Sequence, residues 1–563
     1  MNEILNLFFT YGLTLLLAVF LGKYMAKVYQ GKAVWTDFLK PLENFFFKIS
    51  GIDAQKSLDW KENMKILLVI NFYWLLLTLA VLLSQDYHAF LNPDQNPSMS
   101  LDLALNTVVS FLVNCNLQHY SGEVALSYLS QMTLMFLQFV TAATGMASAV
   151  LVFNAMKENQ TATIGNFYHS FVLSCTRILL PISLVVATIL VFNGTPMTLE
   201  GKATITTLEG TEQQIARGVT AAMVAIKQLG TNGGGYFGVN SAHPLENPTY
   251  WTNTAEVMSI FLIPIAMIFA LGEYLQRKKF ALMIFGVMTF GYLCLQIPAI
   301  YYELNGNPIL TKMGINQELG SMEGKEIRIG SAASAYWAIH TTVTSNGSVN
   351  AMHDSLMPIS GAMAMLGMMI NAFYGGVGVG FLNFYLYIIV AVFISGLMVG
   401  RTPEFLGRKI EASEIKIAVL ITLLHPFLIL VGTAIATFLL VQNPEYAWLN
   451  NSGFHGFSEM LFEFTSSAAN NGSGFEGLGD NTPFWNLSTA VVLALGRYLP
   501  IIAPVAIAAR LANKKFIPVG SGTLPTDNLA FGVMILAVIF IVAALSFFPA
   551  LVLGAFAEHF TIY

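Results

Sequence analysis

The stretch Gly230-Thr231-Asn232-Gly233-Gly234-Gly235 is the fullest of four short loops that share an asparagine–glycine signature and lie between hydrophobic segments. The other three loops run over 114–118, 344–348 and 470–474. Aligned on Asn116, Asn232, Asn346 and Asn471, the copies lie 116, 114 and 125 residues apart. One such pair alone would indicate only a turn. Four copies at regular intervals instead predict an ion-selective pore that is folded from four repeats.

The composition places the chain in a lipid bilayer. Of its 563 residues, 55% are hydrophobic and only 10% are charged, and the mean hydropathy is +0.63. These values exclude an ordinary water-soluble protein. Hydrophobic stretches near the ~20 residues that cross the hydrocarbon core predict ten spans, over 4–22, 66–85, 130–153, 171–193, 256–275, 280–302, 362–398, 417–441, 485–509 and 529–556.

Each of the four loops follows a shorter segment of about a dozen residues, which is too short to cross and predicts a re-entrant pore helix. The expected fold is an all-α polytopic membrane protein with about ten transmembrane helices. It has four helix–pore loop–helix repeats in a pseudo-four-fold arrangement and one extra helix at each end. Residues 1–563 are expected to form a single membrane domain. Its parts are an N-terminal helix and connector (1–65), pore repeats (66–155, 156–279, 280–400 and 401–515) and a C-terminal helix (516–563).

Positive charge orients the chain, since cytoplasmic loops retain Lys and Arg. With the N-terminus outside, 20 of the 27 Lys and Arg residues fall at inner ends or inner loops. Both termini are therefore predicted to be extracytoplasmic, with all four re-entrant loops open to the exterior. The first span has its positive charges after the apolar run, which favours a retained helix over a signal peptide. The inner segment 23–65 is either a charged connector or a helix along the membrane surface.

The loops suit a dehydrated monovalent cation. Backbone carbonyls can replace its hydration oxygens only where the chain adopts extended or left-handed turns, which glycine permits. Three loops contain the glycines that such turns need, namely Gly233, Gly234, Gly347 and Gly472. The first loop has Asn116-Leu117-Gln118 instead. Each short helix also points its C-terminal carbonyls at its loop, which favours a cation. The neighbouring residues expected to pin the loops by hydrogen bonds are Thr231, Asn232, Thr344, Ser345, Asn470 and Asn471.

Several stretches resemble the family of potassium-binding subunits A of the Kdp potassium-transporting ATPase, within the superfamily of potassium transporters. They are NLQHYSGE (116–123), QLGTNGGGYFGVNSAHPLENPT (228–249), TSNGSVNAMHDS (344–355), GRTPEFLGRKIE (400–411), SSAANNGSGFEGL (466–478) and GRYLPII (496–502). The resemblance implies filter residues Gln118, Gly234, Gly347 and Gly472, with the Gln118 side chain serving where the first repeat lacks a glycine. Beside them it implies Asn116, Asn232, Asn346 and Asn471. The sequence departs from the commoner family strings at Leu117, His119 and Asn346.

The resemblance also implies a role. Potassium, the substrate, would enter the filter from outside and pass through an intramembrane tunnel into a KdpB-type P-type subunit, which uses ATP and Mg²⁺. Further partners would be small subunits of the KdpC and KdpF types and membrane lipids, but not nucleic acid. The protein would lie in the bacterial inner membrane. The chain carries no GxxxxGK[ST] or DKTGT string, so no catalytic site of its own and no organic cofactor are expected.

Two other functions are alternatives to the pump subunit. One is a self-sufficient potassium channel or ion-coupled symporter of the same superfamily. The other, an intramembrane enzyme, is disfavoured because no nucleophile–base or paired-carboxylate set stands out.

A glycine-rich run interrupts the seventh span at Gly375, Gly376, Gly378 and Gly380. A dinucleotide-binding fingerprint is excluded, because the context offers no strand and no βαβ unit. By resemblance this run is the gating loop of the third repeat, which blocks the straight path inward. Arg401 would hold the loop or dock it to the catalytic partner. The alternatives are helix packing through small residues and, for Arg401, an ordinary inner anchor.

Arg497 is a guanidinium within a predicted span, where a charge is costly and usually functional or paired. Below the pore it would repel cations or hold the exit closed by a salt bridge. The alternative is an anchor to a carboxylate or to backbone carbonyls. The histidines and the three cysteines show no ligand spacing, so potassium is the only metal ion expected and no transition-metal site is predicted.

Overall fold

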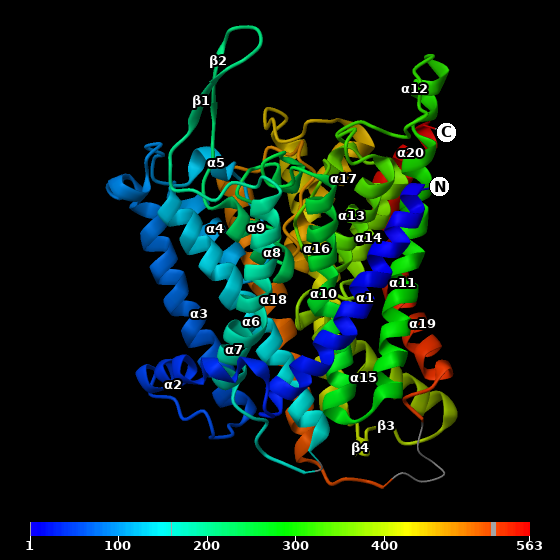
Figure 1. The fold of residues 1–563 in the computed structure, drawn as a ribbon. Helices are drawn as coiled ribbons and strands as arrows, with labels where there is room; N and C mark the ends of the chain where they lie inside the picture. The colour runs from blue at the N-terminus through cyan, green and yellow to red at the C-terminus, as the bar shows by residue number, and fades with distance from the viewer. Residues whose placement is uncertain (1, 159, 519–524, 563) are drawn as a thin grey trace.

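The protein is a bundle of long helices that lie side by side (Figure 1). The computed structural model describes residues 2–158, 160–518 and 525–562. Within these residues ten helices are long and apolar enough to cross a membrane, as predicted. The two ends of the chain lie at the same end of the bundle as the hairpin of β1 (Ala203–Thr206) and β2 (Glu212–Ile215) (Figure 1).

Four units of span, short helix and span follow one another. The first has α3 (Trp60–Leu83), α4 (Leu101–Leu112) and α6 (Tyr128–Lys157). The second has α7 (Phe167–Leu173), which continues through the π-helical turn η4 (Ser174–Leu179) into α8 (Leu180–Phe192), then α9 (Thr220–Leu229) and α10 (Tyr250–Leu275). The third has α11 (Lys278–Asn305), α13 (Ser331–Val343), α14 (Pro358–Ile370) and α15 (Val379–Val399). The fourth has α16 (Ala412–Gln442), α17 (Gly453–Ala469) and α18 (Pro483–Asn513).

Burial separates inner helices from outer ones. In the most apolar 18-residue stretch of each helix, 89% of the residues are buried in α6, against 22% in α3 and 22% in the first helix, α1 (Asn2–Tyr29). The short helix α13 is buried along its whole length. Its small residues Ala332, Ala335 and Ala338 allow neighbouring backbones to approach closely. The four short helices therefore form the centre, and apolar faces such as that of Phe8 and Phe9 point outward.

The predicted seventh span is not one helix. Residues 371–378 break it into α14 and α15, which confirms the predicted interruption, although the bounds 362–398 do not hold for one helix. The break has a backbone cause, because Asn371, Tyr374, Gly375, Gly376 and Gly378 all have positive φ angles. Left-handed backbone cannot continue a right-handed helix.

The segment after the first span contains a helix, α2 (Lys40–Ile49), at the end of the bundle opposite the chain termini (Figure 1). Glu43 of α2 binds Arg177 of η4 through both carboxylate oxygens, at 2.6 and 2.5 Å. The aromatic residues Phe45 and Phe46 stay exposed. An anchored helix with exposed aromatic side chains favours the surface-helix interpretation over an irregular connector.

Candidate functional site

The four loops share one backbone pattern. At the end of each short helix one residue has a positive φ, namely Asn114 (62°), Thr231 (48°), Ser345 (51°) and Asn470 (51°). The N–H of the next residue donates to the carbonyl five residues earlier, from Cys115, Asn232, Asn346 and Asn471. The structure therefore aligns Cys115, and not Asn116, with the three asparagines. The predicted register of the first copy is wrong by one residue, and Asn116 occupies the position of Gly233, Gly347 and Gly472.

These equivalent positions meet in a closed ring. A Cβ atom on Gly233 would collide with the backbone of Gly347, and one on Gly347 would collide with the backbone of Gly472. A Cβ atom on Gly472 would collide in turn with the carbonyl of Cys115 in the first loop. Loops two, three, four and one thus touch backbone to backbone. Only glycine allows so close an approach at these positions.

The first and second loops complete the ring through Gln118. Its side-chain Nε2 donates to the carbonyl of Gly235 at 3.1 Å, and its Oε1 accepts from the N–H of Gly235 at 2.9 Å. Beside this pair, a Cβ atom on Gly234 would lie 2.5 Å from the Cβ atom of Asn116. The amide of Gln118 therefore joins two loops. In this structure it braces the ring, and its expected role as a substitute for the missing glycine stays a prediction.

Side-chain amides of the loops bond to the neighbouring repeat at three further places. Asn114 Nδ2 donates to the carbonyl of Gly230 at 3.0 Å. Asn346 Nδ2 donates to Gln228 Oε1 at 3.1 Å, and Asn471 Nδ2 donates to the carbonyl of Thr341 at 3.0 Å. Of these three asparagines, only Asn471 was among the residues expected to pin the loops. Thr344 instead donates to the carbonyl of His340 within its own helix, at 2.7 Å.

A fully buried lysine, which the sequence alone did not predict, lies behind the ring. Lys227 of α9 forms an ion pair with Glu246, and its Nζ also donates to Asn240 Oδ1 at 3.1 Å and Ser241 Oγ at 2.8 Å. Ser241 Oγ donates at 2.6 Å to Glu256 of α10. The available signal was the place of this lysine inside a re-entrant segment, where a charge needs partners.

Replacement of Lys227 by methionine is expected to destabilise the chain strongly. Removing one partner of a buried ion pair costs about 3–5 kcal/mol, because the other charge stays buried without compensation. The matched control is Lys202→Met, in the loop that precedes β1, since Lys202 is only partly buried. Thermal unfolding of the purified chain in detergent should show a clearly lower Tm for Lys227→Met only. Equal Tm values for the two variants would contradict this role.

The glycine-rich loop over 371–378 lies against the helix ends that carry the ring. The N–H of Gly375 donates to the carbonyl of Val343 at 2.7 Å, and the N–H of Val377 donates to Thr231 Oγ1 at 3.0 Å. Asn371 Oδ1 accepts from Ser345 Oγ at 2.8 Å. The loop therefore contacts the second and third repeats at the positions where their pore helices end.

The two arginines of interest lie in different places. Arg497 of α18 is buried, and its Nη2 donates to the carbonyl of Thr141 in α6 at 3.4 Å. It lies next to the glycine-rich loop, because a Cβ atom on Gly145 would collide with the carbonyl of Val377 and lie 3.4 Å from Arg497 Nη2. Within the described part of the chain its polar partner is a backbone carbonyl, and no ion pair to a carboxylate is formed.

Arg401 is exposed beyond the far end of α15. That helix has 21 residues and so separates Arg401 from the glycine-rich loop by about 30 Å. The expectation that Arg401 holds this loop is therefore wrong. Its docking to a catalytic partner stays a prediction.

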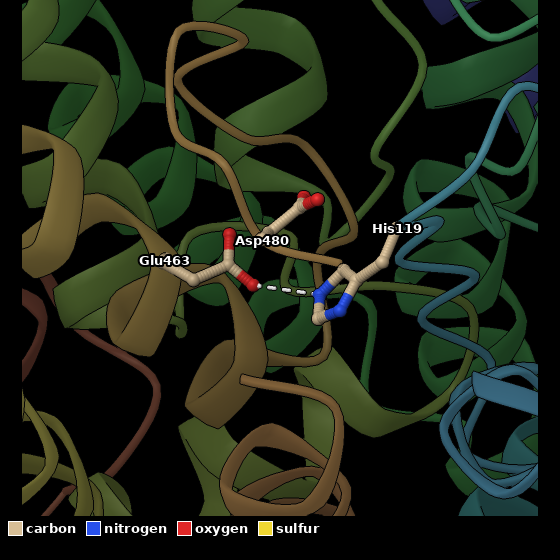
Figure 2. A group of neighbouring side chains, drawn as sticks. All are labelled: His119, Glu463 and Asp480. Atoms are coloured by element: carbon tan, nitrogen blue, oxygen red, sulfur yellow. Dashed lines mark hydrogen bonds and ion pairs between the residues drawn. The ribbon is translucent and has the colours of Figure 1, made fainter. Parts of the chain in front are cut away.

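A cavity of about 330 Å³ opens above the ring. Its lining includes Gln118, Gly347 and Gly472 of the loops, together with His119 and Asp480. His119 Nε2 lies 3.1 Å from Glu463 Oε1 (Figure 2). Burial lowers the pKa of His119, but the carboxylates of Asp480 and Glu463 outweigh this effect and raise it to about 9. The side chains of His119 and Glu463 thus form a buried charged pair at the mouth of the ring.

Comparison with known proteins gives the same family over the whole chain. Residues 8–560 match the family described as "Potassium-transporting ATPase A subunit". Proteins named "Potassium-transporting ATPase potassium-binding subunit" from Flavobacterium psychrophilum, Bacteroides thetaiotaomicron and Geobacillus kaustophilus are 60%, 57% and 46% identical. The alignments cover 100% of both chains for the first two, and 98% of both chains for the third.

A solved structure supports the fold separately. The potassium transporter TrkH from Vibrio parahaemolyticus aligns with a TM-score of 0.51 at 14% identity, over 87% of this chain and 96% of that chain. At this identity the likeness concerns the fold alone. With four loops closed into a ring, ten apolar helices and relatives that match from end to end, the chain belongs to the family of potassium-transporting ATPase A subunits.

Proposed function

We propose that this chain is the potassium-selective binding and translocating subunit of an ATP-driven uptake pump in a bacterial inner membrane. The observation that supports this function best is the closed ring of four loops at the ends of four short buried helices. The printed names of the relatives, which describe a potassium-binding subunit of a potassium-transporting ATPase, agree with it.

In this proposal potassium enters the cavity from the extracytoplasmic side and loses its water in the ring. Backbone carbonyls of Asn116, Gly233, Gly347 and Gly472 and of the residues beside them replace the lost oxygens. The C-terminal ends of α4, α9, α13 and α17 add negative potential, which favours a cation. The hydrogen bonds between loops hold the ring at one size, so that a smaller ion is coordinated less well.

The inner side of the ring would be closed to straight passage. The glycine-rich loop over 371–378 lies under the second and third pore helices, and Arg497 adds a buried positive charge beside it. A cation that leaves the ring would therefore turn sideways through an intramembrane tunnel into a P-type catalytic subunit, which hydrolyses ATP with Mg²⁺. Small subunits of the KdpC and KdpF types would complete the complex, and both chain termini would be extracytoplasmic.

The purified chain alone is expected to bind potassium without hydrolysing ATP, because the sequence carries no nucleotide-binding motif. Potassium binding and ATPase activity are measured on the chain alone and on the complex reconstituted in vesicles. Uptake of potassium should require both ATP and the catalytic partner. ATP hydrolysis by a preparation free of other subunits would contradict the division of labour. Downhill uptake by the chain alone would favour a self-sufficient channel.

A further inference from the structure

Three side chains from distant parts of the sequence meet beside the mouth of the ring. His119 lies in the first loop, Glu463 in α17 and Asp480 in the segment between α17 and α18 (Figure 2). One ligand atom of each lies within 4.8 Å of the other two. The side chains of His119 and Glu463 are 0% and 2% exposed. His119 and Asp480 also line the cavity, so the group is reachable from it.

The imidazole of His119 is held in one orientation by Asn486 of α18. Its Nδ1 donates to Asn486 Oδ1 at 2.7 Å. Asn486 Nδ2 donates to Asp102 Oδ2 at 2.8 Å and to Asn481 Oδ1 at 3.2 Å. Turning the Asn486 amide over, so that its oxygen and nitrogen exchange places, would break both hydrogen bonds. A proton on Nδ1 leaves the lone pair of Nε2 pointing at the carboxylate of Glu463. Two electron-rich atoms at 3.1 Å need a cation between them, either a proton or a metal ion.

We propose that His119, Glu463 and Asp480 form a binding site for a divalent transition-metal ion of the zinc type at the outer mouth of the ring. With metal–ligand distances of about 2.0–2.2 Å, neighbouring ligands of such an ion lie about 3.0–3.4 Å apart. The 3.1 Å between His119 Nε2 and Glu463 Oε1 matches this spacing. A rotation of the Asp480 side chain brings in the third ligand, and water from the cavity fills the remaining position.

The ligand chemistry selects the ion. One imidazole with two carboxylates suits zinc and its first-row neighbours, whereas Mg²⁺ and Ca²⁺ prefer ligand sets made of oxygen alone. The hydrogen bond from Nδ1 to Asn486 is the support that metal-binding histidines usually have.

A second histidine among carboxylates, His455, forms a similar group with Asp354 and Glu459. Its two ring nitrogens lie 2.9 Å from Asp354 Oδ1 and 2.9 Å from Glu558 Oε1, so both nitrogens donate to carboxylates. In the protonated form His455 and His119 alike donate through both nitrogens, so a metal ion must displace a proton from either imidazole. The variant His455→Gln therefore tests whether zinc prefers the group that contains His119.

The consequence for transport rests on the proposed function. Gln118, Gly347 and Gly472 line the same cavity as His119 and Asp480. A bound divalent ion would place positive charge at the entrance and repel incoming potassium. External zinc is therefore expected to lower the rate of potassium uptake by the complete pump. The binding of zinc itself does not depend on the direction or the energy source of transport.

The test is calorimetric titration of the purified full chain with Zn²⁺ in the presence of potassium. The wild type should bind one equivalent through this site. His119→Gln, Glu463→Gln and Asp480→Asn should each weaken zinc binding by at least 10- to 100-fold. His455→Gln should leave it within about 2-fold of the wild-type value, and Mg²⁺ should not compete. Each variant must still bind potassium, which shows that it is folded.

Several results would overturn the site. They are the absence of saturable zinc binding by the wild type, undiminished binding by His119→Gln, and equal competition by Mg²⁺. Uptake by the reconstituted pump is the second measurement. Suppose that the three variants lose zinc binding, but that zinc does not change uptake by the wild-type pump. This result would support the site and refute the block at the entrance. If the reconstituted pump takes up no potassium even when zinc is absent, that result counts against the proposed function instead.

Discussion

Replacement of Gly347 by alanine is expected to abolish or strongly reduce potassium selectivity, by a factor of 10 or more against sodium, ammonium or rubidium. A Cβ atom at this position would lie 2.6 Å from Gly472 Cα and would overlap the neighbouring carbonyl carbon. The loop must therefore shift, and the oxygens of the ring with it, while the surrounding helices remain packed. Competition of these ions against potassium binding to the purified chain measures the effect.

The matched control for this prediction is Gly286→Ala in α11. A Cβ atom there would meet nothing within 4 Å, and the residue lies within a regular helix. This variant should keep wild-type affinity and selectivity, since alanine is the better helix former. Unchanged selectivity in Gly347→Ala, and equally in Gly234→Ala, would place the selective site elsewhere in the chain.

Shortening the glycine-rich loop by removal of Gly376 to Gly378 is expected to open a passive leak. In the proposed mechanism this loop closes the straight path below the ring, and its bonds to Val343 and Thr231 hold it there. Without it, potassium should flow down its own gradient in the absence of ATP. Electrical recording from reconstituted membranes measures this current.

A control for the leak is a substitution at the far end of α15, Arg401→Gln, which does not touch the loop and should give no current. Two properties establish that the shortened variant is folded, namely expression in the membrane and potassium binding. A folded, potassium-binding variant without ATP-independent current would mean that these glycines serve helix packing alone.

The fold was largely predictable because its determinants are local. Ten apolar stretches and four spaced loops fixed the number and order of the helices. The glycine run at 375–380 predicted an interruption of the seventh span. Its start at Asn371 was harder to place, because apolar neighbours keep the local hydropathy high even where Asn371 and Tyr374 adopt positive φ. The one-residue error in the first loop has a similar origin. Asparagines stand on both sides of Cys115, and only the hydrogen bond from its N–H shows that Cys115 itself aligns with the asparagines of the other loops.

The candidate site was less predictable, because its partners are far apart in sequence. His119 and Glu463 are 344 residues apart, so no spacing rule for metal ligands could join them. The ion pair of Lys227 and Glu246 was hidden in a different way, since nothing in the sequence links the two residues across the loop that separates them. Arg401 was assigned to the loop that precedes it along the chain, although a whole helix separates them in space.

The most direct test of the central claim is to locate the bound ion. Thallium(I), a potassium substitute with strong anomalous scattering, can be diffused into crystals of the complete complex. The account predicts an anomalous peak on the axis of the ring, between Asn116, Gly233, Gly347 and Gly472, which potassium displaces. A ring without such a peak, together with thallium bound at another place in the chain, would contradict it.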